Sequence, residues 1–330
     1  MGELLLDVQN LTSGYQSKEG NIIAVNDVSF ALKKGEFLGL AGESGCGKST
    51  LAYTLLGLLP SNGRVFDGKI AYQGRDLVGL SERELRTIRW QEISMVFQSA
   101  MSALNPVLTI REQMLDTIFA HEPRMPLKVA ESRIQELMKL VELPVERLDD
   151  YPHQLSGGMK QRVVIALALV LQPNLVLMDE PTTALDVVVQ RSIIRKIEDL
   201  QNELDFSIIF ITHDLSLLIE VSDKIAIMYS GQIVEIGPAR QVYTTPHHPY
   251  TVGLMSSFPS LTGEFREFGG IPGKPPSLQN PPQGCRFHPR CPKAFDLCKE
   301  VTPSLDQISE DHFAACHLHG VQKRGEDTGA

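Results

Sequence analysis

The stretch Gly42-Glu43-Ser44-Gly45-Cys46-Gly47-Lys48-Ser49-Thr50 has the pattern G-x-x-x-x-G-K-S of a phosphate-binding P-loop. An apolar run over 37–41 precedes it and a helix-compatible run over 50–58 follows, which is the strand–loop–helix context that the motif requires. Backbone N–H groups of such a loop point at phosphate oxygens, and the helix adds its positive N-terminal end. We therefore predict a nucleotide site formed by Gly42, Ser44, Gly45, Cys46, Gly47, Lys48, Ser49 and Thr50.

Three side chains of this loop have distinct expected roles. Lys48 supplies a point charge at the β- and γ-phosphates, and the hydroxyl group of Ser49 is suited to ligate Mg²⁺. Cys46 precedes a helix N-terminus, which would lower the pKa of its thiol, but we favour the interpretation that it is a small filler residue. An ordinary Gly-rich turn is the alternative for the whole stretch, and the Lys-Ser register after a strand argues against it.

The composition indicates one large soluble domain with an appendage, or two domains. The chain has 330 residues, 42% of them hydrophobic and 22% charged, and its net charge of −9 argues against a general nucleic-acid-binding surface. Residues 1–7 turn acidic at once, unlike a secretory signal, and the longest apolar run, 163–171, is too short to span a bilayer. We expect a cytoplasmic chain whose membrane role needs a spanning partner.

Strand patterns occur on both sides of the P-loop. Alternating runs predict antiparallel strands over 4–8 and 22–25, and a further strand over 69–72. Near-continuous apolar runs predict buried parallel strands over 93–97, 175–178 and 208–211. A hairpin is predicted around Ser230-Gly231, from 224–229 and 232–236.

A helical insert interrupts this α/β core over about 107–171. Its clearest helix has one apolar face for core packing, formed by Leu127, Ala130, Ile134, Leu137, Met138 and Val141. Beyond residue 258, prolines at 272, 275, 276, 281 and 282 indicate a stiff connector. We predict a 1–258 domain with a helical subdomain at about 100–171, a 259–320 connector with a small cysteine-rich extension, and a disordered tail over 321–330.

Two carboxylates follow the buried strand 175–178. The carboxyl end of a strand is where α/β sheets place ligands. Asp179 is suited to hold Mg²⁺, directly or through a water, and Glu180 is suited to orient or deprotonate an attacking water. An acidic strand end that only caps the next turn is the alternative, and the neighbouring P-loop motif argues against it.

A second phosphate-binding element is predicted at 155–162, where the sequence reads L-S-G-G-M-K-Q-R. Ser156 is a good N-cap for the apolar helix that follows, and Gly157-Gly158 permit close backbone approach. A helix N-terminus with free N–H groups binds phosphate. One chain therefore holds two half-sites, which two chains packed head to tail would combine.

The order of the P-loop, the 155–162 signature and Asp179-Glu180 resembles the ATPase subunit of an ABC transporter over roughly residues 4–258. The signature is highly specific for that family. The resemblance implies an α/β fold: a P-loop NTPase (RecA-like) core with an antiparallel β subdomain and a helical signature subdomain. It also implies that two ATP molecules are bound between two such domains, and that hydrolysis of ATP to ADP and phosphate opens the dimer.

Further residues match motifs of that family. The resemblance implies that Tyr15 stacks on adenine, and that Gln98 is the Q-loop glutamine, which reaches the Mg²⁺ and water region and senses the membrane subunits. It places Ala184-Leu185-Asp186 at the dimer interface and His213 at the γ-phosphate. The expected catalytic residues are thus Glu180, His213 and Gln98. The expected Mg²⁺ site comprises Ser49, Gln98 and Asp179, and the partner chain's ATP contacts Ser156, Gly157 and Gly158.

Four of the five cysteines lie near the C-terminus with the spacing C-x5-C-x6-C-x17-C: Cys285, Cys291, Cys298 and Cys316. Such a segment has few apolar residues and often needs a staple to fold. Four thiolates can bind Zn²⁺ or an iron–sulfur cluster, and this spacing alone does not choose between them. In a cytosolic protein, metal binding is favoured over disulfides.

This C-terminal sequence resembles the extension of oligopeptide/dipeptide-type transporter ATPases. The residues that carry the resemblance are 246–251, 271–273, 284–292 and 316–317. The resemblance implies a 4Fe–4S cluster on the four cysteines. It further implies a peripheral protein at the cytoplasmic face of the bacterial inner membrane. The expected partners are a second ATPase subunit, a paralogue, with two membrane-spanning permeases and, through them, a peptide-binding receptor.

The predicted function is therefore to power the import of dipeptides or oligopeptides. Sister importers of the same type carry sugars or metal chelates, which is one alternative. A soluble ABC ATPase of DNA repair or translation is another, but tandem ABC units, a coiled-coil insert and a basic charge are absent from the sequence. An exporter ATPase is disfavoured because exporters often fuse this domain to membrane spans.

Overall fold

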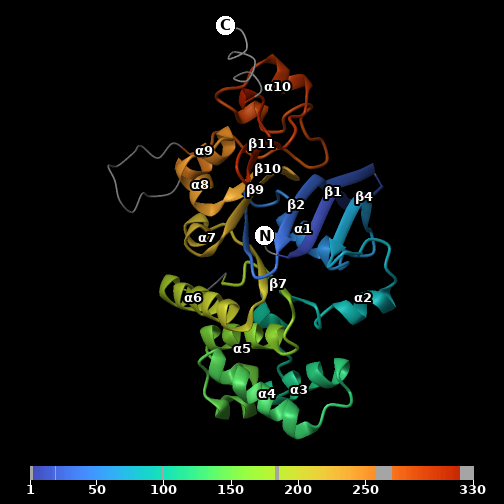
Figure 1. Cartoon of the computed structure of the whole chain (residues 1–330), viewed down its shortest axis with the longest axis vertical. Coiled ribbons are helices and arrows are strands. Elements are labelled where there is room, and N and C mark those ends of the chain that lie inside the picture. The colour runs from blue at the N-terminus through green and yellow to red at the C-terminus, as the bar shows by residue number, and fades with distance from the viewer. Residues whose placement is uncertain (1–2, 19, 99, 183–185, 257–269, 320–330) are drawn as a thin grey trace. The chain divides into compact units, whose positions relative to one another are not determined.

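The buried strands predicted from near-continuous apolar runs are present (Figure 1), and the chain divides into two compact units. The computed structural model describes residues 3–18, 20–98, 100–182, 186–256 and 270–319. Unit 1 comprises 1–5, 32–37 and 79–211. Unit 2 comprises 6–31, 38–78 and 212–330, so the chain crosses between the units several times.

Unit 1 contains a parallel arrangement of β6 (Ile93–Val96), β7 (Leu175–Asp179) and β8 (Ser207–Ile211). Every residue of these strands is buried, which explains why their sequences are near-continuous runs of apolar residues. Val96 is in register with Met178, and Asp179 with Ile211. The carboxyl ends of the three strands therefore meet at one edge.

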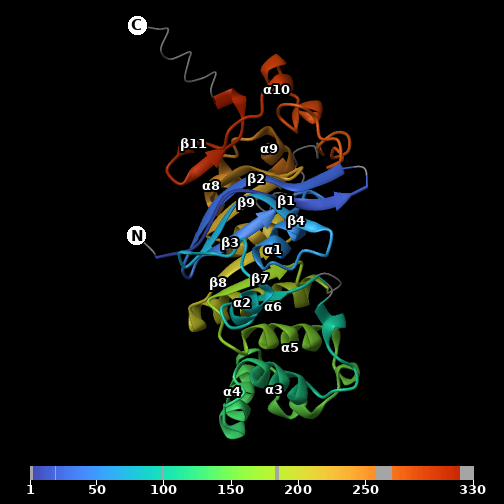
Figure 2. The same ribbon diagram turned by 90° about the vertical axis from the view of Figure 1, so that its right-hand side faces the viewer.

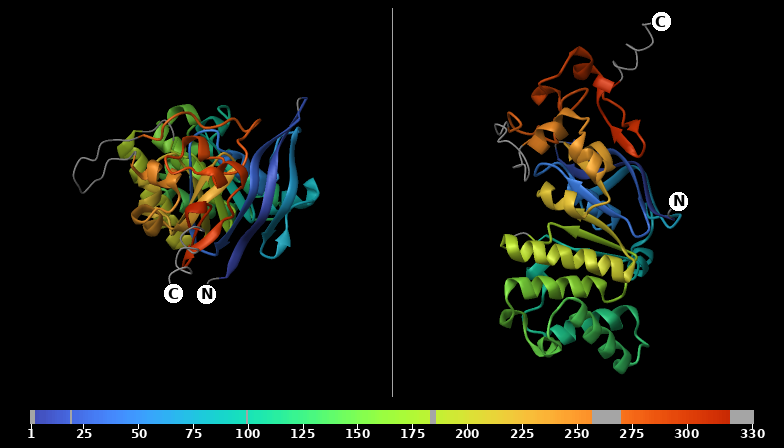
Figure 3. Two further views of the ribbon diagram at one scale, coloured as in Figure 1. Left: turned by 90° about the horizontal axis from the view of Figure 1, so that it is seen from above. Right: turned by 60° about the vertical axis from the view of Figure 1, so that its left-hand side comes forward.

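The helical part of unit 1 consists of separate helices and short 3-10 turns, several of which lie within the range predicted for the insert. Its helices and 3-10 turns are α2 (Glu82–Ile88), η1 (Ala100–Ala103), α3 (Ile110–His121), α4 (Leu127–Leu140), η2 (Val145–Asp149), η3 (Pro152–Gln154), α5 (Gly157–Leu169) and α6 (Val187–Leu204). α3, α4 and α5 lie side by side (Figure 2), and α5 also lies along α6 (Figure 3). The predicted apolar face of α4 is buried except at Leu127, which is 58% exposed because it stands at the first position of the helix.

Unit 2 contains an antiparallel sheet in the order β2-β1-β4-β5. Its strands are β1 (Leu4–Ser17), β2 (Gly20–Lys33), β4 (Gly63–Tyr72) and β5 (Arg75–Asp76), of which only the first two residues of β1 and the last two of β2 belong to unit 1. β1 and β2 are much longer than the alternating runs predicted. Register shifts in the β1–β4 pairing, between Gln9 and Ser13, break the alternation without ending the strand.

A second set of strands in unit 2 continues into the C-terminal segment. β3 (Phe37–Ala41) runs parallel to β9 (Lys224–Tyr229), and β10 (Gln232–Pro238) forms the predicted hairpin with β9. β12 (His312–Ala314) then pairs with β10, and β11 (Asp306–Ser309) with β12. The C-terminal segment therefore extends the β9–β10 sheet by backbone hydrogen bonds, which its sequence pattern does not indicate.

The remaining elements of unit 2 are short: α1 (Lys48–Leu55), α7 (Leu215–Val221), α8 (Ala239–Thr244), α9 (Pro249–Ser256), η4 (His288–Arg290) and α10 (Asp296–Glu300). α1 begins two residues earlier than the predicted run and ends at Leu55, shortly before Gly57 and Pro60. Among the described residues, none of the helices has the length and hydropathy needed to cross a membrane. The predicted tail over 321–330 and the start of the predicted connector, 259–269, lie outside the described residues.

Candidate functional site

The P-loop joins β3 to α1 in unit 2, and its three glycines have backbone conformations that other residues rarely adopt. Gly42 has a φ of 150° and Gly47 a φ of 109°. A Cβ atom at Gly42 would lie 2.1 Å from the carbonyl oxygen of Met228, and one at Gly47 would lie 2.1 Å from that of Ala24. The loop thus packs directly against neighbouring backbone, while Ser44 and Gly45 at its tip are exposed.

The side chain of Lys48 lies against the loop itself. Its Nζ donates to the carbonyl oxygen of Gly42 at 2.7 Å and to that of Glu43 at 3.1 Å, and the residue is 6% exposed. The ammonium group is therefore held beside the backbone that the motif predicts will carry phosphate. Tyr15 and Thr50 share a hydrogen bond of 3.0 Å through their hydroxyl groups, which places the predicted adenine-stacking ring next to α1.

Cys46 is buried, with 4% of its surface exposed. Burial raises the pKa of its thiol, and this effect outweighs the positive charge of Lys48, which lowers it. The predicted lowering of the pKa by the helix N-terminus is therefore wrong, because the thiolate would be desolvated. The favoured interpretation of Cys46 as a small filler residue agrees with this environment.

His213 is exposed in the segment that leads into α7. The N–H of Thr212 donates to the carbonyl oxygen of Leu40 at 3.4 Å, so this segment runs beside β3, the strand that ends in the P-loop. Asp214 caps α7 by accepting from the N–H groups of Ser216 and Leu217 at 3.0 and 3.3 Å. His213 is thus held between a strand and a capped helix of unit 2.

In unit 1, the ends of β6 and β7 bring Gln98 and Glu180 together. Gln98 and Glu180 lie two residues beyond the paired residues Val96 and Met178, and Nε2 of Gln98 donates to Oε2 of Glu180 at 3.1 Å. Asp179, the last residue of β7, is 1% exposed. Glu180 has a φ of 47°, so the chain turns sharply after the strand. Two predicted catalytic residues and a predicted Mg²⁺ ligand therefore gather at one edge of the strands.

The predicted signature lies at the N-terminus of α5. Ser156 is its N-cap and accepts from the N–H of Met159 at 3.4 Å, as predicted. Ser156 and Gly157 are exposed, and a Cβ atom at Gly158 would lie 3.0 Å from Cγ1 of Val189. The glycine thus permits α5 to pack close to α6.

Asp186 is an exposed N-cap of α6 and accepts from the N–H groups of Val188 and Val189 at 3.1 and 3.0 Å. The adjoining Ala184 and Leu185 lie outside the described residues. Asp186 therefore already has a structural role as a helix cap, beside its predicted place at a dimer interface.

The four C-terminal cysteines lie in one neighbourhood of unit 2. The N–H of Cys285 donates to the carbonyl oxygen of Cys298 at 2.9 Å. Burial raises the pKa of the Cys316 thiol to about 11, and the thiols of Cys285, Cys291 and Cys298 add to the rise. Within the described ranges, however, no three or more His, Cys, Asp or Glu side chains are arranged to hold a metal ion. The donor set fits a metal centre in kind, and the positions of the side chains do not form a closed ligand group.

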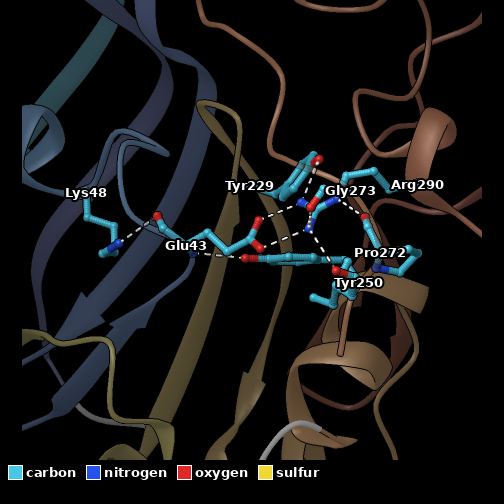
Figure 4. Close-up of polar contacts among 8 residues, drawn as sticks. Glu43, Lys48, Tyr229, Tyr250, Pro272, Gly273 and Arg290 are labelled. Atoms are coloured by element: carbon cyan, nitrogen blue, oxygen red, sulfur yellow. Dashed lines mark hydrogen bonds and ion pairs between the residues drawn. The ribbon is translucent and has the colours of Figure 1, made fainter. Parts of the chain in front are cut away.

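Residues outside the predicted set also contact the P-loop. Arg290, from the cysteine-bearing segment, forms two ion-pair contacts with Glu43, and Tyr250 accepts from the N–H of Glu43 (Figure 4). Sequence reasoning missed these residues because Glu43 occupies a variable position of the P-loop motif. The only signal was the density of cationic and aromatic side chains around Cys285 and Cys291.

Two family models match this chain. The model of the ABC transporter family matches residues 25–183, and the model of the oligopeptide/dipeptide transporter C-terminal region matches residues 234–298. The first covers the P-loop, the signature and the acidic end of β7. The second begins within β10 and extends as far as Cys298.

Curated relatives match over almost the whole length. The dipeptide transport ATP-binding protein DppD of Bacillus subtilis is 44% identical over 319 residues, which is 96% of this chain and 95% of the relative. The oligopeptide transport ATP-binding protein OppD of Salmonella typhimurium is 42% identical over 315 residues, which is 95% of this chain and 93% of the relative.

Solved structures share the fold. The dimeric structure of MJ0796, a bacterial ABC transporter cassette, has a TM-score of 0.64 at 31% identity and covers 72% of this chain and 99% of that one. CbiO1 from Clostridium perfringens, part of the ABC transporter complex cbiONQ, has a TM-score of 0.64 at 26% identity, covering 74% and 92%. The α/β P-loop fold predicted from the sequence is thereby confirmed.

Proposed function

Because this chain belongs to the family of ABC transporter ATP-binding subunits, we propose that it hydrolyses ATP to power the import of dipeptides or oligopeptides. Its activity is that of an ABC-type ATPase, which binds ATP and uses Mg²⁺. The observation that carries the cargo assignment is the 44% identity to a dipeptide transport protein over 96% of the chain, C-terminal region included. The proposal includes oligopeptides as well as dipeptides, because a relative of similar identity is named for oligopeptide transport.

We propose the following roles for the residues of unit 2. Lys48 and the N–H groups of the P-loop bind the phosphates, and Ser49 ligates Mg²⁺. Tyr15 stacks on adenine, and His213 contacts the γ-phosphate. The support is the glycine-dependent backbone of the loop, the position of Tyr15 at α1, and the position of His213 beside β3.

We propose that the residues of unit 1 carry the hydrolytic step. Glu180 orients and deprotonates the attacking water, while Asp179 and Gln98 act at the Mg²⁺ ion. The hydrogen bond between Gln98 and Glu180 supports this assignment, because it orients the carboxylate at the end of β7. Ser156, Gly157 and Gly158 are proposed to contact the ATP held by a second ATPase subunit.

The proposed partners are that second ATPase, a paralogue, and two membrane-spanning permeases, which receive peptide from a receptor. The chain would then lie peripherally at the cytoplasmic face of the bacterial inner membrane. The test is reconstitution of the complete complex in vesicles, with dipeptide, oligopeptide, sugar and metal-chelate uptake measured against ATP hydrolysis. Peptide-dependent uptake supports the proposal, and uptake of a sugar or metal chelate alone would overturn the cargo assignment.

We also propose that Cys285, Cys291, Cys298 and Cys316 hold a 4Fe–4S cluster, which would staple the C-terminal segment. The hydrogen bond of 2.9 Å from the N–H of Cys285 to the carbonyl oxygen of Cys298 brings two of the four cysteines together and supports the donor set. Loading with a cluster requires that the four side chains converge. The measurement is iron and sulfide content with visible absorbance of anaerobically purified protein, for the parental chain and for Cys291→Ser. A colourless, zinc-loaded protein would contradict the cluster.

A further inference from the structure

We infer that Arg290 is a positioning residue for the P-loop and acts through Glu43 on Lys48. This inference rests on the proposed function, since it takes the P-loop to be the ATP-binding loop. Arg290 comes from the cysteine-bearing C-terminal segment, 247 residues from Glu43 in the chain, and both lie in unit 2. The C-terminal segment would thereby tune nucleotide binding from outside the motifs that contact ATP.

The contact between the two side chains is a bidentate ion pair. Nη1 of Arg290 lies 2.7 Å from Oε2 of Glu43, and Nη2 lies 3.0 Å from Oε1. The side chains are 6% and 26% exposed, so solvent screens the pair only partly. A planar guanidinium that meets both carboxylate oxygens fixes the orientation of the carboxylate as well as its position.

Arg290 is itself held firmly from the C-terminal side. Its Nε donates to the carbonyl oxygen of Pro272 at 2.7 Å, and its Nη1 donates to the hydroxyl group of Tyr229 at 3.3 Å. The guanidinium carbon lies 5.8 Å from the centre of the Tyr229 ring, within cation–π distance. Figure 4 shows the guanidinium between the carboxylate and the 272–273 backbone. The cation therefore has little freedom to follow a displaced carboxylate.

Glu43 passes this constraint to Lys48 through its own backbone. Its N–H donates to the hydroxyl oxygen of Tyr250 at 2.9 Å, and its carbonyl oxygen accepts from Nζ of Lys48 at 3.1 Å. The rings of Tyr229 and Tyr250 are 4.6 Å apart, and both pack on Phe287, so their hydroxyl groups are rigidly placed. Glu43 is thus anchored at three points, which are its side chain, its N–H and its carbonyl oxygen.

A loop anchored in this way is preorganised for nucleotide binding. If the anchor is removed, the Glu43 peptide gains freedom and its carbonyl oxygen no longer aims Lys48. Ordering the loop must then be done by the ligand, which weakens binding. We expect Arg290→Gln and Glu43→Gln each to raise the Kd and KM for ATP about fivefold to tenfold, with a smaller change in kcat at saturating ATP.

The experiment measures MgATP affinity, kcat, KM and Tm for the full-length parental chain and its variants. Arg290→Gln, Glu43→Gln and the double variant form a double-mutant cycle. If Arg290 acts through Glu43, the double variant binds ATP no more weakly than the worse single variant. Arg290→Lys keeps the charge without the fork, and we expect it to restore only part of the affinity.

The matched control is Lys299→Ala, which removes the exposed ion pair with Asp296 in the same C-terminal segment. We expect parental affinity for this variant. A lower Tm with unchanged ATP affinity in Arg290→Gln would overturn the inference and leave Arg290 a structural staple. Additive losses in the double variant would overturn it as well. Failure of the parental chain to bind ATP would instead overturn the proposed function.

Discussion

Glu180 adopts a left-handed backbone conformation, with a φ of 47°, directly after the last residue of β7. Such a conformation costs about 1 kcal/mol or more in a residue with a side chain. The N–H of Glu180 donates to the carbonyl oxygen of Ile211 at 2.8 Å, and Gln98 contacts its carboxylate. The strained turn is thus held by the ends of three strands, and it aims the carboxylate out of the sheet.

At the residue scale, Glu180→Gln should bind ATP with nearly parental affinity and hydrolyse it at least about 100-fold more slowly, because an amide does not accept a proton. Phosphate release and nucleotide binding, measured on the same preparation, test this expectation. Glu203→Gln, an exposed position of the same unit, is the control and should keep parental turnover. Near-parental turnover of Glu180→Gln would remove Glu180 from the hydrolytic step.

Lys48→Ala should weaken ATP binding about tenfold or more and reduce turnover, since the ammonium group at the phosphates is lost. Equilibrium binding of a fluorescent ATP analogue gives the affinity. The comparison is Lys69→Ala, an exposed lysine on β4 of the same unit, for which binding should not change. Equal affinities of the two variants would contradict the predicted role of Lys48.

At the scale of elements, a buried carboxylate joins the sheet to its C-terminal strand. Glu235 on β10 is completely buried and accepts from the N–H groups of His247 and His248, each at 2.8 Å. Nε2 of His312 on β12 lies 2.8 Å from its Oε1. Burial alone would raise the pKa of Glu235, but these hydrogen bonds outweigh it and the pKa lies below its ordinary value. The paired carboxylate therefore stabilises β12 on the sheet while it is ionised.

This cluster predicts loss of stability in acid. Burial lowers the pKa of His248 to about 4 from 6.5, so its neutral form contributes stability fully above pH 6.5, and this is lost as the pH falls towards 4. The ionised carboxylate of Glu235 contributes its full stability above the ordinary pKa of a glutamate. This stability is lost as the pH falls through the lower pKa that Glu235 has in the folded protein. The shift of His248 corresponds to about 3 kcal/mol of unfolding free energy.

Urea unfolding at pH 7, 6 and 5 measures this effect. His248→Asn retains an oxygen that can accept from the N–H of Tyr250 but does not titrate, so its stability should change less between pH 7 and 5. His153→Asn, at an exposed position, should keep the parental pH dependence. If His248→Asn keeps the parental slope, the acid sensitivity arises elsewhere.

At the scale of the whole molecule, the signature at the start of α5 is displayed to solvent. Ser156 and Gly157 are exposed, and the helix behind them is buried at Val163, Ile165 and Ala166. A rigid, exposed helix N-terminus is suited to bind a phosphate that another chain presents. This arrangement supports a functional unit of two ATPase chains.

Ser156→Arg should therefore leave ATP binding by the single chain near its parental value while abolishing ATP-dependent pairing with the second ATPase and reducing turnover of the complex about 100-fold or more. Light scattering with and without MgATP, together with phosphate release, tests this. Ser132→Arg on the exposed face of α4 is the control and should pair normally. Parental pairing by Ser156→Arg would contradict the shared-site proposal.

The fold class and the local chemistry could be predicted from the order of residues along the chain. The P-loop, the cap at Ser156 and the apolar runs of β6, β7 and β8 depend on neighbours along the chain, so composition and spacing carry them. The P-loop nucleotide site follows in the same way, because its ligands are consecutive backbone groups. The ends of β6 and β7, at Val96 and Asp179, were predicted to within one residue, whereas β1 and β2 extend far beyond their predicted ends.

Contacts between segments that lie far apart in the chain became known only from the folded structure. Two of these contacts are the pairing of β12 with β10 and the ion pair of Arg290 with Glu43. The burial that raises the pKa of Cys46 likewise depends on how the folded chain surrounds this residue. No periodicity encodes such contacts, because each depends on how separately specified elements pack and on how much water that packing removes. For that reason the P-loop motif could be predicted from nine residues, whereas the side chains that hold it in place could not.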